Sequence, residues 1–152
     1  MKLAEALQER ADLNIRLQQL RSRLENNALV QEGEQPAEEP SVLLKELHES
    51  ISRLEWLISR INLTNCATVV DGKTLTEWIA KKDALTMKLS FYRELVNTAS
   101  GTIYRARNSE IKILPTVQVR ELQKQVDDMA KELRLLDNLL QQTNWTTDLI
   151  EA

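Results

Sequence analysis

Two side chains of this sequence have the chemistry of catalysts or metal ligands, and each type occurs once. His48 is the only histidine and Cys66 is the only cysteine. An imidazole can transfer protons near neutral pH or bind a metal, and a thiolate is a nucleophile. A zinc protease motif H-E-x-x-H would need a second histidine where Ser52 stands after His48 and Glu49. A lone histidine without other ligands nearby is a poor metal site, so we interpret His48 as a surface residue of a helix.

Cys66 has no catalytic partner in the sequence beyond His48. Because unpaired cysteine is among the most buried residue types, we expect Cys66 to fill a small core space, with a reactive thiol as the alternative. The sequence contains no G-x-S-x-G, phosphate-binding loop or dinucleotide fingerprint, and its three glycines are too few to build one. It therefore predicts no catalytic, cofactor-binding or metal-binding residues, and a protein that is not an enzyme.

The composition favours long amphipathic helices that bury a core. Of 152 residues, 42% are hydrophobic and 28% are charged, and three prolines accompany the three glycines. The net charge of −3 gives no basic footprint for nucleic acid. A single cysteine excludes an intrachain disulfide, and no apolar run approaches the ~20 residues that span a bilayer. Acidic residues interrupt the N-terminal segment where a signal peptide needs an apolar core, so the expected location is the cytoplasm.

Hydrophobic residues recur at alternating steps of three and four, which predicts four helices at about 2–29, 41–64, 75–99 and 116–143. Such a row, here called a seam, buries one stripe of a helix against its neighbour. The predicted seams are Leu3, Ala6, Arg10, Leu13, Leu17, Leu20 and Leu24; Leu44, Leu47, Ile51, Leu54, Ile58 and Ile61; Leu75, Trp78, Lys82, Leu85, Leu89, Tyr92, Val96 and Ala99; and Val119, Leu122, Val126, Met129, Leu133, Leu136 and Leu140.

Further apolar residues beside these seams widen the stripes beyond a two-stranded coil. The predicted fold class is therefore mainly α, an antiparallel four-helix bundle in a single domain over residues 1–152. An acidic linker at 31–40 joins the first two helices, and short β-hairpins at about 67–74 and 102–114 form the other connections. Asp71-Gly72 suits the type I′ turn of the first hairpin, and Thr74 with Glu77 forms the T-x-x-E capping box of the helix that follows.

The pentapeptide TNCAT at 64–68 is matched 79 positions later by TNWTT at 143–147. The same offset matches Leu43 with Leu122, Leu54 with Leu133 and Leu57 with Leu136, so the second and fourth predicted helices resemble equivalent halves. Asparagine is the non-glycine residue best able to adopt the left-handed conformation past a helix end. We interpret both Thr-Asn pairs as helix stops.

Other side chains are candidates for contacts between proteins. Four leucines lie off the principal seams and Trp145 follows the last helix, so together they predict an interface in a homo-oligomer, either a dimer or a higher ring. The candidate interface residues are Leu57, Leu95, Leu135, Leu139 and Trp145. The second hairpin is locally basic, and its candidate contact residues for an acidic partner or a lipid headgroup are Arg105, Arg107 and Lys112.

Several separated strings give the chain a resemblance to a known family: QEGEQPAEEP, TNCAT, DGKTLTEWIAKKDAL, NSEIK, LQKQVDDMAKEL and TNWTTDL. On these strings the sequence resembles the septicolysin-like family of small bacterial proteins from end to end. The resemblance implies an α-helical cytoplasmic protein for which homo-oligomers are one expected state, and it implies no catalytic residues. The family name suggests a thiol-activated, pore-forming cytolysin, but such proteins carry a Trp-rich Cys loop and TNCATVV contains no tryptophan.

Two functional hypotheses follow from these observations. The first is a non-enzymatic, self-associating helical bundle that acts as a scaffold or interaction module. The alternative is a membrane-active, pore-forming protein whose helices or hairpins rearrange on lipid. Only this alternative involves a membrane, and neither hypothesis involves nucleic acid.

Overall fold

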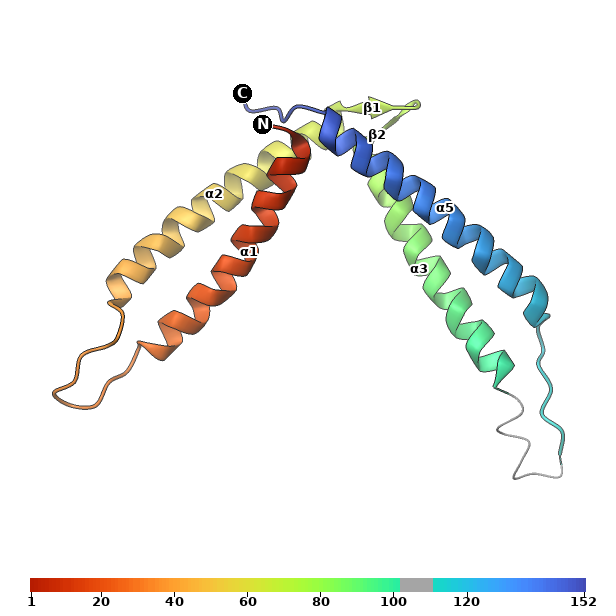
Figure 1. Ribbon diagram of the computed structural model, residues 1–152, viewed down its shortest axis with the longest axis horizontal. Helices are drawn as coiled ribbons and strands as arrows, with labels where there is room; N and C mark the ends of the chain where they lie inside the picture. Colours follow the sequence, from red (N-terminus) through yellow and green to blue (C-terminus); the bar gives the residue numbers. More distant parts are fainter. Residues whose placement is uncertain (102–110) are drawn as a thin grey trace. The chain divides into compact units, whose positions relative to one another are not determined.

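The protein is mainly helical, with one small two-stranded sheet, in a computed structural model that describes residues 1–101 and 111–152. This confirms the predicted helical class, while the assembly of the helices into a bundle stays a prediction. The elements shown in Figure 1 are α1 (Leu3–Asn26), α2 (Pro40–Ala67), β1 (Val69–Val70), β2 (Lys73–Thr74), α3 (Leu75–Ser100) and α5 (Val119–Thr146).

The chain divides into two compact units, which are described separately. The first unit contains Met1–Val70 together with Thr143–Ala152, and the second contains Asp71–Gln142. The boundaries fall at the turn between β1 and β2 and within the last turns of α5. The prediction of a single domain over residues 1–152 stays a prediction.

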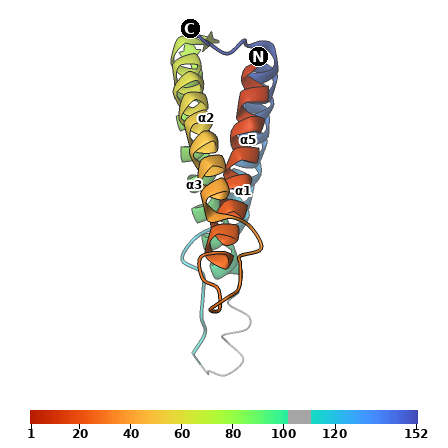
Figure 2. The ribbon, with the colours of Figure 1, turned by 90° about the vertical axis from the view of Figure 1, so that its left-hand side faces the viewer.

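In the first unit α1 and α2 lie side by side and run in opposite directions (Figure 1). Figure 2 shows the same two helices after a rotation of 90° about the vertical axis. The buried face of α1 repeats every seven residues, as the predicted seam requires. The repeat is formed by Ala6, Leu13 and Leu20, and Leu3 and Ala4 are also buried at the start of the helix. Asn27, the next residue in this repeat, is also buried and ends the helix.

The seam of α2 differs from the predicted one. The fully or nearly buried residues are Leu43, Ser50, Leu57, Ile61 and Thr64, whereas Leu44, Ile51 and Ile58 are 54%, 47% and 41% exposed. Of the six predicted seam residues, Ile61 is buried and Leu47 and Leu54 are partly buried, as expected. The other three each lie one position after a buried residue, because the prediction selected an unbroken series of aliphatic side chains. The structure instead places Ser50 and Thr64 in the seam and leaves the aliphatic row beside it.

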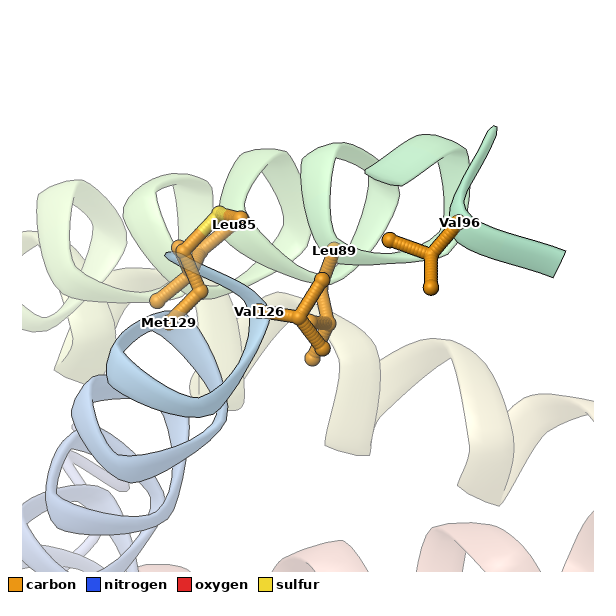
Figure 3. Close-up of a cluster of buried hydrophobic side chains, with 5 residues drawn as sticks. All are labelled: Leu85, Leu89, Val96, Val126 and Met129. Carbon is orange, nitrogen blue, oxygen red and sulfur yellow. The ribbon is translucent and has the colours of Figure 1, made fainter. Parts of the chain in front are cut away.

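In the second unit α3 packs along α5 in the predicted seams. Figure 3 shows Leu85, Leu89 and Val96 of α3 pointing toward Val126 and Met129 of α5, and all five are buried. Tyr92, Val119, Leu122, Ala130 and Leu133 pack around this cluster. Apolar burial of this kind is the main contribution to holding two helices together.

The connection between β1 and β2 confirms the predicted type I′ turn. Asp71 and Gly72 have φ angles of 48° and 80°, the positive values that both central positions of this turn require.

The predicted capping box at the start of α3 is confirmed by two hydrogen bonds. The Thr74 N–H donates to Glu77 Oε2 at 2.7 Å, and the Glu77 N–H donates to Thr74 Oγ1 at 3.2 Å.

The Thr-Asn pairs are not the helix stops that the sequence suggested. Asn65 and Asn144 are helical, and α2 and α5 continue to Ala67 and Thr146. Both ends nevertheless close in the same way: the Thr68 N–H donates to the Thr64 carbonyl and the Thr147 N–H to the Thr143 carbonyl, each at 2.9 Å. The repeated T-N-x-x-T string thus marks the last helical turn, because the first and last threonines are joined by its final hydrogen bond.

The loop between α1 and α2 is anchored to the end of α1. Asn27 Nδ2 donates to the Arg23 carbonyl at 2.8 Å, and the Glu38 N–H donates to Asn27 Oδ1 at 2.9 Å. The Arg23 guanidinium also binds the Glu38 carboxylate, so the predicted acidic linker is held at both its backbone and its side chain. Over residues 1–101 and 111–152, no helix has the length and apolarity that crossing a membrane requires.

Candidate functional site

The two residues with catalytic chemistry do not form a site together. His48 and Cys66 are both exposed and both belong to α2, 18 residues apart. At 1.5 Å per residue this separates them by about 27 Å along the helix, so they cannot act on one substrate atom. Among the described residues, no three His, Cys, Asp or Glu side chains gather as a metal site would require.

The exposure of Cys66 corrects the expectation that it fills the core. Since α2 continues past Thr64, Cys66 lies two positions beyond a seam residue. Two helical steps rotate a side chain by about 200°, which turns Cys66 away from α1. The expectation depended on how often unpaired cysteines are buried, and the helix face on which Cys66 lies overrides that tendency here.

The α1·α2 hairpin has two edges of different character, one on each side of its seam. The charged edge carries ion pairs between α1 and α2. Arg53 donates from Nε and Nη2 to the two Glu9 carboxylate oxygens at 2.6 and 2.8 Å, and Arg23 lies 3.8 Å from Glu46. The bond from Arg53 lowers the pKa of the Glu9 carboxyl, against the opposing effect of partial burial. The Arg53 guanidinium also lies over the Trp56 ring, 4.5 Å from its centroid.

The other side of the seam, the apolar edge, has no matching ion pairs among the described residues. We define it by the exposed row Leu44, Ile51 and Ile58 of α2 and the adjoining seam residues Leu17, Leu24 and Leu47. Four of these six side chains line a groove of about 380 Å³, which Gln18, Arg21 and Glu25 of α1 complete. Two helices packed against each other cannot cover this edge by themselves, so the hairpin presents an apolar surface with a polar margin.

Of the predicted interface residues, one is buried inside the first unit and the others are at least partly exposed. Leu57 is completely buried in the seam of the first unit, so its predicted exposure is wrong. Leu95 and Leu135 of the second unit are 44% and 55% exposed, and Leu139 is partly buried. Trp145, in the last turn of α5, is 51% exposed. Their role in an interface stays a prediction.

The second unit has an ion pair on each side of its seam, and one of them includes Asp137, the position equivalent to Ile58 of the apolar row. Lys82 Nζ donates to Asp137 Oδ1 at 2.5 Å, and Lys81 lies 3.4 Å from Glu132. Lys82 and Asp137 border an open groove of about 410 Å³, whose lining also includes Leu89, Arg93, Ala130, Leu133 and Arg134. Lys82, the one charged residue of the predicted third seam, is therefore neutralised from the facing helix.

The candidate basic contact cannot be assembled from the described residues. Arg105 and Arg107, together with residues 102–110 of the predicted second hairpin, lie outside them. Lys112 is described and exposed, and residues 111–114 form no strand. The proposed contact with an acidic partner or a lipid headgroup stays a prediction.

The C-terminal segment supplies contacts that the sequence analysis missed. The Leu3 N–H donates to the Thr147 carbonyl and the Leu149 N–H to the Met1 carbonyl, each at 2.9 Å. The Ile150 N–H donates to Thr64 Oγ1 at 2.9 Å, while Thr64 Oγ1 donates to the Arg60 carbonyl at 2.8 Å. Thr64 is fully buried, and these bonds satisfy its hydroxyl. The recurrence of Thr64 in T-N-x-x-T was the available signal for its structural importance.

Comparisons with known proteins give relatives but no activity. The profile of a family described as "Family of unknown function (DUF6847)" matches residues 10–149. A crystal structure of a functionally unknown conserved protein from Corynebacterium diphtheriae is 41% identical and has a TM-score of 0.94, with 98% of each chain covered. No curated protein matches. These findings do not test the resemblance to the septicolysin-like family, which stays a prediction.

Proposed function

We propose, for a chain that belongs to the DUF6847 family of unknown function, the role of a non-enzymatic module that associates with copies of itself and acts as a scaffold. The observation that carries this proposal is the apolar edge of the α1·α2 hairpin. Leu44, Ile51 and Ile58 follow one another at seven-residue intervals and are each about half exposed. Solvated helix faces rarely repeat aliphatic residues at this spacing, whereas helices that pack on other helices do so regularly.

The groove beside this row supports the same role. Leu17 and Leu24 of α1 and Leu47 of α2 line it with Ile51, so the row and the groove form one continuous surface. Contiguous apolar surface of this kind often marks a site of protein association. The polar margin of Arg21 and Glu25 is typical of the rim of such a site.

The free energy gained by burying this apolar row limits how strongly two copies can associate. Complete burial of an aliphatic side chain contributes about 1.5–3 kcal/mol, so a half-exposed one contributes roughly 1 kcal/mol. Three such side chains from each of two copies would contribute about 6 kcal/mol, close to the lower end of the roughly 4–15 kcal/mol that association costs. The row alone is therefore too small, and the adjoining groove must also be buried if the complex is to be stable.

Light scattering of the purified chain at micromolar concentration tests the proposal. We expect a mass of at least twice that of the 17.5 kDa chain. Ile58→Lys should lower this mass, because it places an ammonium group in the apolar row. Ser59→Lys, which adds the same charge at the neighbouring exposed position, is the matched control and should leave the mass unchanged.

Circular dichroism must show that both variants keep their helices. A wild-type chain that stays monomeric throughout the micromolar range would contradict the proposal. So would equal masses for Ile58→Lys and the wild type. Release of dye from liposomes by the wild-type chain, lost in Ile58→Lys, would instead favour a membrane-active role for the same edge.

A further inference from the structure

We propose that the segment after α5 is a releasable strap, which opens and closes while both helical hairpins stay folded. The strap is formed by residues 147–150, and it runs past the start of α1 (Figure 1). It pairs with the residues that begin α1 in the way that β1 pairs with β2, but without a turn between the two sides. This inference is independent of the proposed self-association, since every contact that carries it lies within one chain.

The strap and the β1–β2 hairpin both precede a helix that begins in the same way. Lys2 is the N-cap residue of α1, and Thr74, 72 positions later, is the N-cap residue of α3. The Lys2 N–H donates to Glu5 Oε2 at 2.6 Å, as the Thr74 N–H does to the glutamate at the same distance along its own helix. Leu3 and Leu75, the first residues of the two helices, are both buried.

The two pairings also share one register. The two-residue turn between β1 and β2 places Val69 opposite Thr74. Shifting Val69 forward by 79 positions gives Asp148, and shifting Thr74 back by 72 gives Lys2. These two residues form the antiparallel bridge between the strap and the start of α1. The strap is therefore a second copy of the hairpin pairing, formed by residues 146 positions apart.

The bridge has the geometry of a non-hydrogen-bonded pair. The N–H groups of Leu3 and Leu149 donate across the strap on either side of the bridge, each at 2.9 Å. Lys2 and Asp148 therefore belong to the kind of pair whose Cα atoms lie about 4.5 Å apart and whose side chains are close together. Their ammonium and carboxylate groups form an ion pair at 2.7 Å.

Few interactions oppose the opening of the strap. Leu149 is buried, while Asp148 and Ile150 on either side of it are exposed. The ion pair to Lys2 is open to solvent and adds little. A turn keeps β1 beside β2 even when their hydrogen bonds break, whereas no turn restrains the strap once it has left α1. The strap is thus the kind of segment that opens locally at a lower free energy than the helices around it.

Opening of the strap uncovers one end of the α1·α2 seam. Thr64 Oγ1 accepts the Ile150 N–H, and the Leu3 N–H donates to the Thr147 carbonyl. Thr64 and Leu3 are both 0% exposed when the strap is closed. The strap therefore controls the access of solvent to the hydroxyl and the leucine at this end of the first unit.

Amide hydrogen exchange of the full chain tests whether the strap opens by itself. The amides of Leu149 and Ile150 should exchange at least tenfold faster than those of Leu13 and Leu57 in the seam, after correction for intrinsic rates. Their exchange should also depend little on low concentrations of urea, because local opening exposes little surface. Equal protection of the two groups would show that the strap opens only when the helices unfold, and would overturn the proposal.

A disulfide across the bridge should hold the strap closed. In a Cys66→Ser background, Lys2→Cys with Asp148→Cys should crosslink within one chain under mild oxidation, since the Cα separation of such a pair is within disulfide range. Oxidation should slow exchange of the Ile150 amide at least tenfold, and reduction should reverse the change. A folded chain that fails to crosslink, or that crosslinks only to other chains, would contradict the register of the strap.

The equivalent pair of the β1–β2 hairpin is the matched control. Val69→Cys with Thr74→Cys, in the same Cys66→Ser background, should also crosslink, because the two pairs share one register. Its oxidation should leave exchange of the Ile150 amide unchanged. Equal slowing at Ile150 in both double variants would show that a crosslink stiffens the whole chain, and the strap would then not be a separate moving part.

A single substitution keeps the test decisive if the cysteine variants do not fold. Leu149→Ala removes the buried side chain of the strap, so exchange of the Ile150 amide should accelerate at least threefold. The amides of Leu13 and Leu57 should exchange at the rates of the wild type. Equal acceleration at all three amides would mean that Leu149 stabilises the first unit as a whole, and that outcome would also overturn the proposal.

Discussion

Ile58 in α2 and Asp137 in α5 occupy equivalent positions, 79 residues apart, on two helices that end with the same T-N-x-x-T turn. Their surroundings are equivalent as well. Arg10 and Lys82 lie 72 residues apart and each interrupts the seam of the helix that faces these positions. In the second unit Lys82 binds Asp137, while in the first unit an aliphatic side chain stands where the acid would be.

The comparison shows that the buried seam, which stabilises each helical hairpin, is independent of the exposed residues at its edges. Both units bury leucines at equivalent seam positions, including Leu57 and Leu136. The second unit has an ion pair on each side of its seam, Lys82 with Asp137 on one edge and Lys81 with Glu132 on the other. The first unit has the pair Glu9–Arg53 at the positions equivalent to Lys81 and Glu132, and on its other edge it leaves an aliphatic row exposed. The seam therefore specifies a helical hairpin in both units, and the edge gives each unit a different surface.

Truncation of the equivalent seam leucines should give the largest effect. We expect Leu57→Ala and Leu136→Ala each to lower the free energy of unfolding by about 2–5 kcal/mol, because both remove buried side chains and leave cavities. Urea denaturation followed by circular dichroism measures this change. Val42→Ala, at a position 62% exposed, is the control and should cost less than about 0.5 kcal/mol. A small effect at Leu57 alone would show that the seams are not equivalent.

Loss of the Thr64 hydroxyl should give the next largest effect. Thr64→Val keeps the shape of the side chain but removes the acceptor of the Ile150 N–H, and we expect a cost of about 1–2 kcal/mol. Hydrogen exchange at the Ile150 amide should accelerate in the variant. Thr86→Val of α3 is the matched control, since Thr86 also donates to the carbonyl four residues before it. Equal costs at the two positions would mean that the contact with the C-terminal segment adds nothing.

Exchanging the residues at the equivalent edge positions should have a smaller effect on stability. Asp137→Ile deprives Lys82 of its acid, and we expect a loss of about 0.5–1 kcal/mol, because both side chains are more than a third exposed and screened by solvent. Ile58→Asp should change stability by less than about 1 kcal/mol and lower the self-associated mass. Urea denaturation at low and high salt tests the first effect, which should shrink at high salt. A loss that is independent of salt would exclude an electrostatic cause.

The Glu9–Arg53 pair on the charged edge should give the smallest effect, and one that depends on pH. The pKa of Glu9 is lower in the folded chain than its ordinary value of 4.5. Its contribution is therefore fully present above the unfolded pKa and is lost as the pH falls through the folded pKa. We expect Glu9→Gln to cost about 0.5 kcal/mol at pH 7, after allowance for solvent screening, and nothing below both pKa values. The exposed Glu49→Gln serves as the control.

Urea denaturation at a series of pH values gives the difference between Glu9→Gln and the wild type. A difference that grows as the pH falls below 4 would contradict the assigned sign of the pKa shift. A difference that stays constant over the whole range would show that the substitution acts through packing rather than through charge.

The sequence predicted most of the secondary structure because each feature depended on neighbouring residues. Three of the four seams follow from periodicity alone, since the spacing of apolar residues fixes which face of a helix can be buried. The turn at Asp71-Gly72 and the capping box at Thr74 and Glu77 depend on local backbone and side-chain chemistry. The end of α2 was placed three residues early because asparagine is compatible with a helix stop without requiring one.

The seam of α2 shows where the sequence alone was insufficient. Leu43 and Leu57 on one row compete with Leu44, Ile51 and Ile58 on the next, and both rows fit a helical repeat. The match of Leu43 and Leu57 with Leu122 and Leu136 already favoured the correct row. Hydrophobicity favoured the other, because that row contains no serine.

Sequence by itself determined that this chain forms long heptad-patterned helices and where its tight turn lies, since these depend on residues within about one helical turn of each other. Packing against α1 decided which row of α2 is buried, and with it the exposure of Cys66 and of the aliphatic row around Ile51. The contact of the C-terminal segment with Met1, Leu3 and Thr64 was also decided only in three dimensions. Such contacts join residues far apart in the chain, and no local pattern encodes the partner of a backbone N–H group.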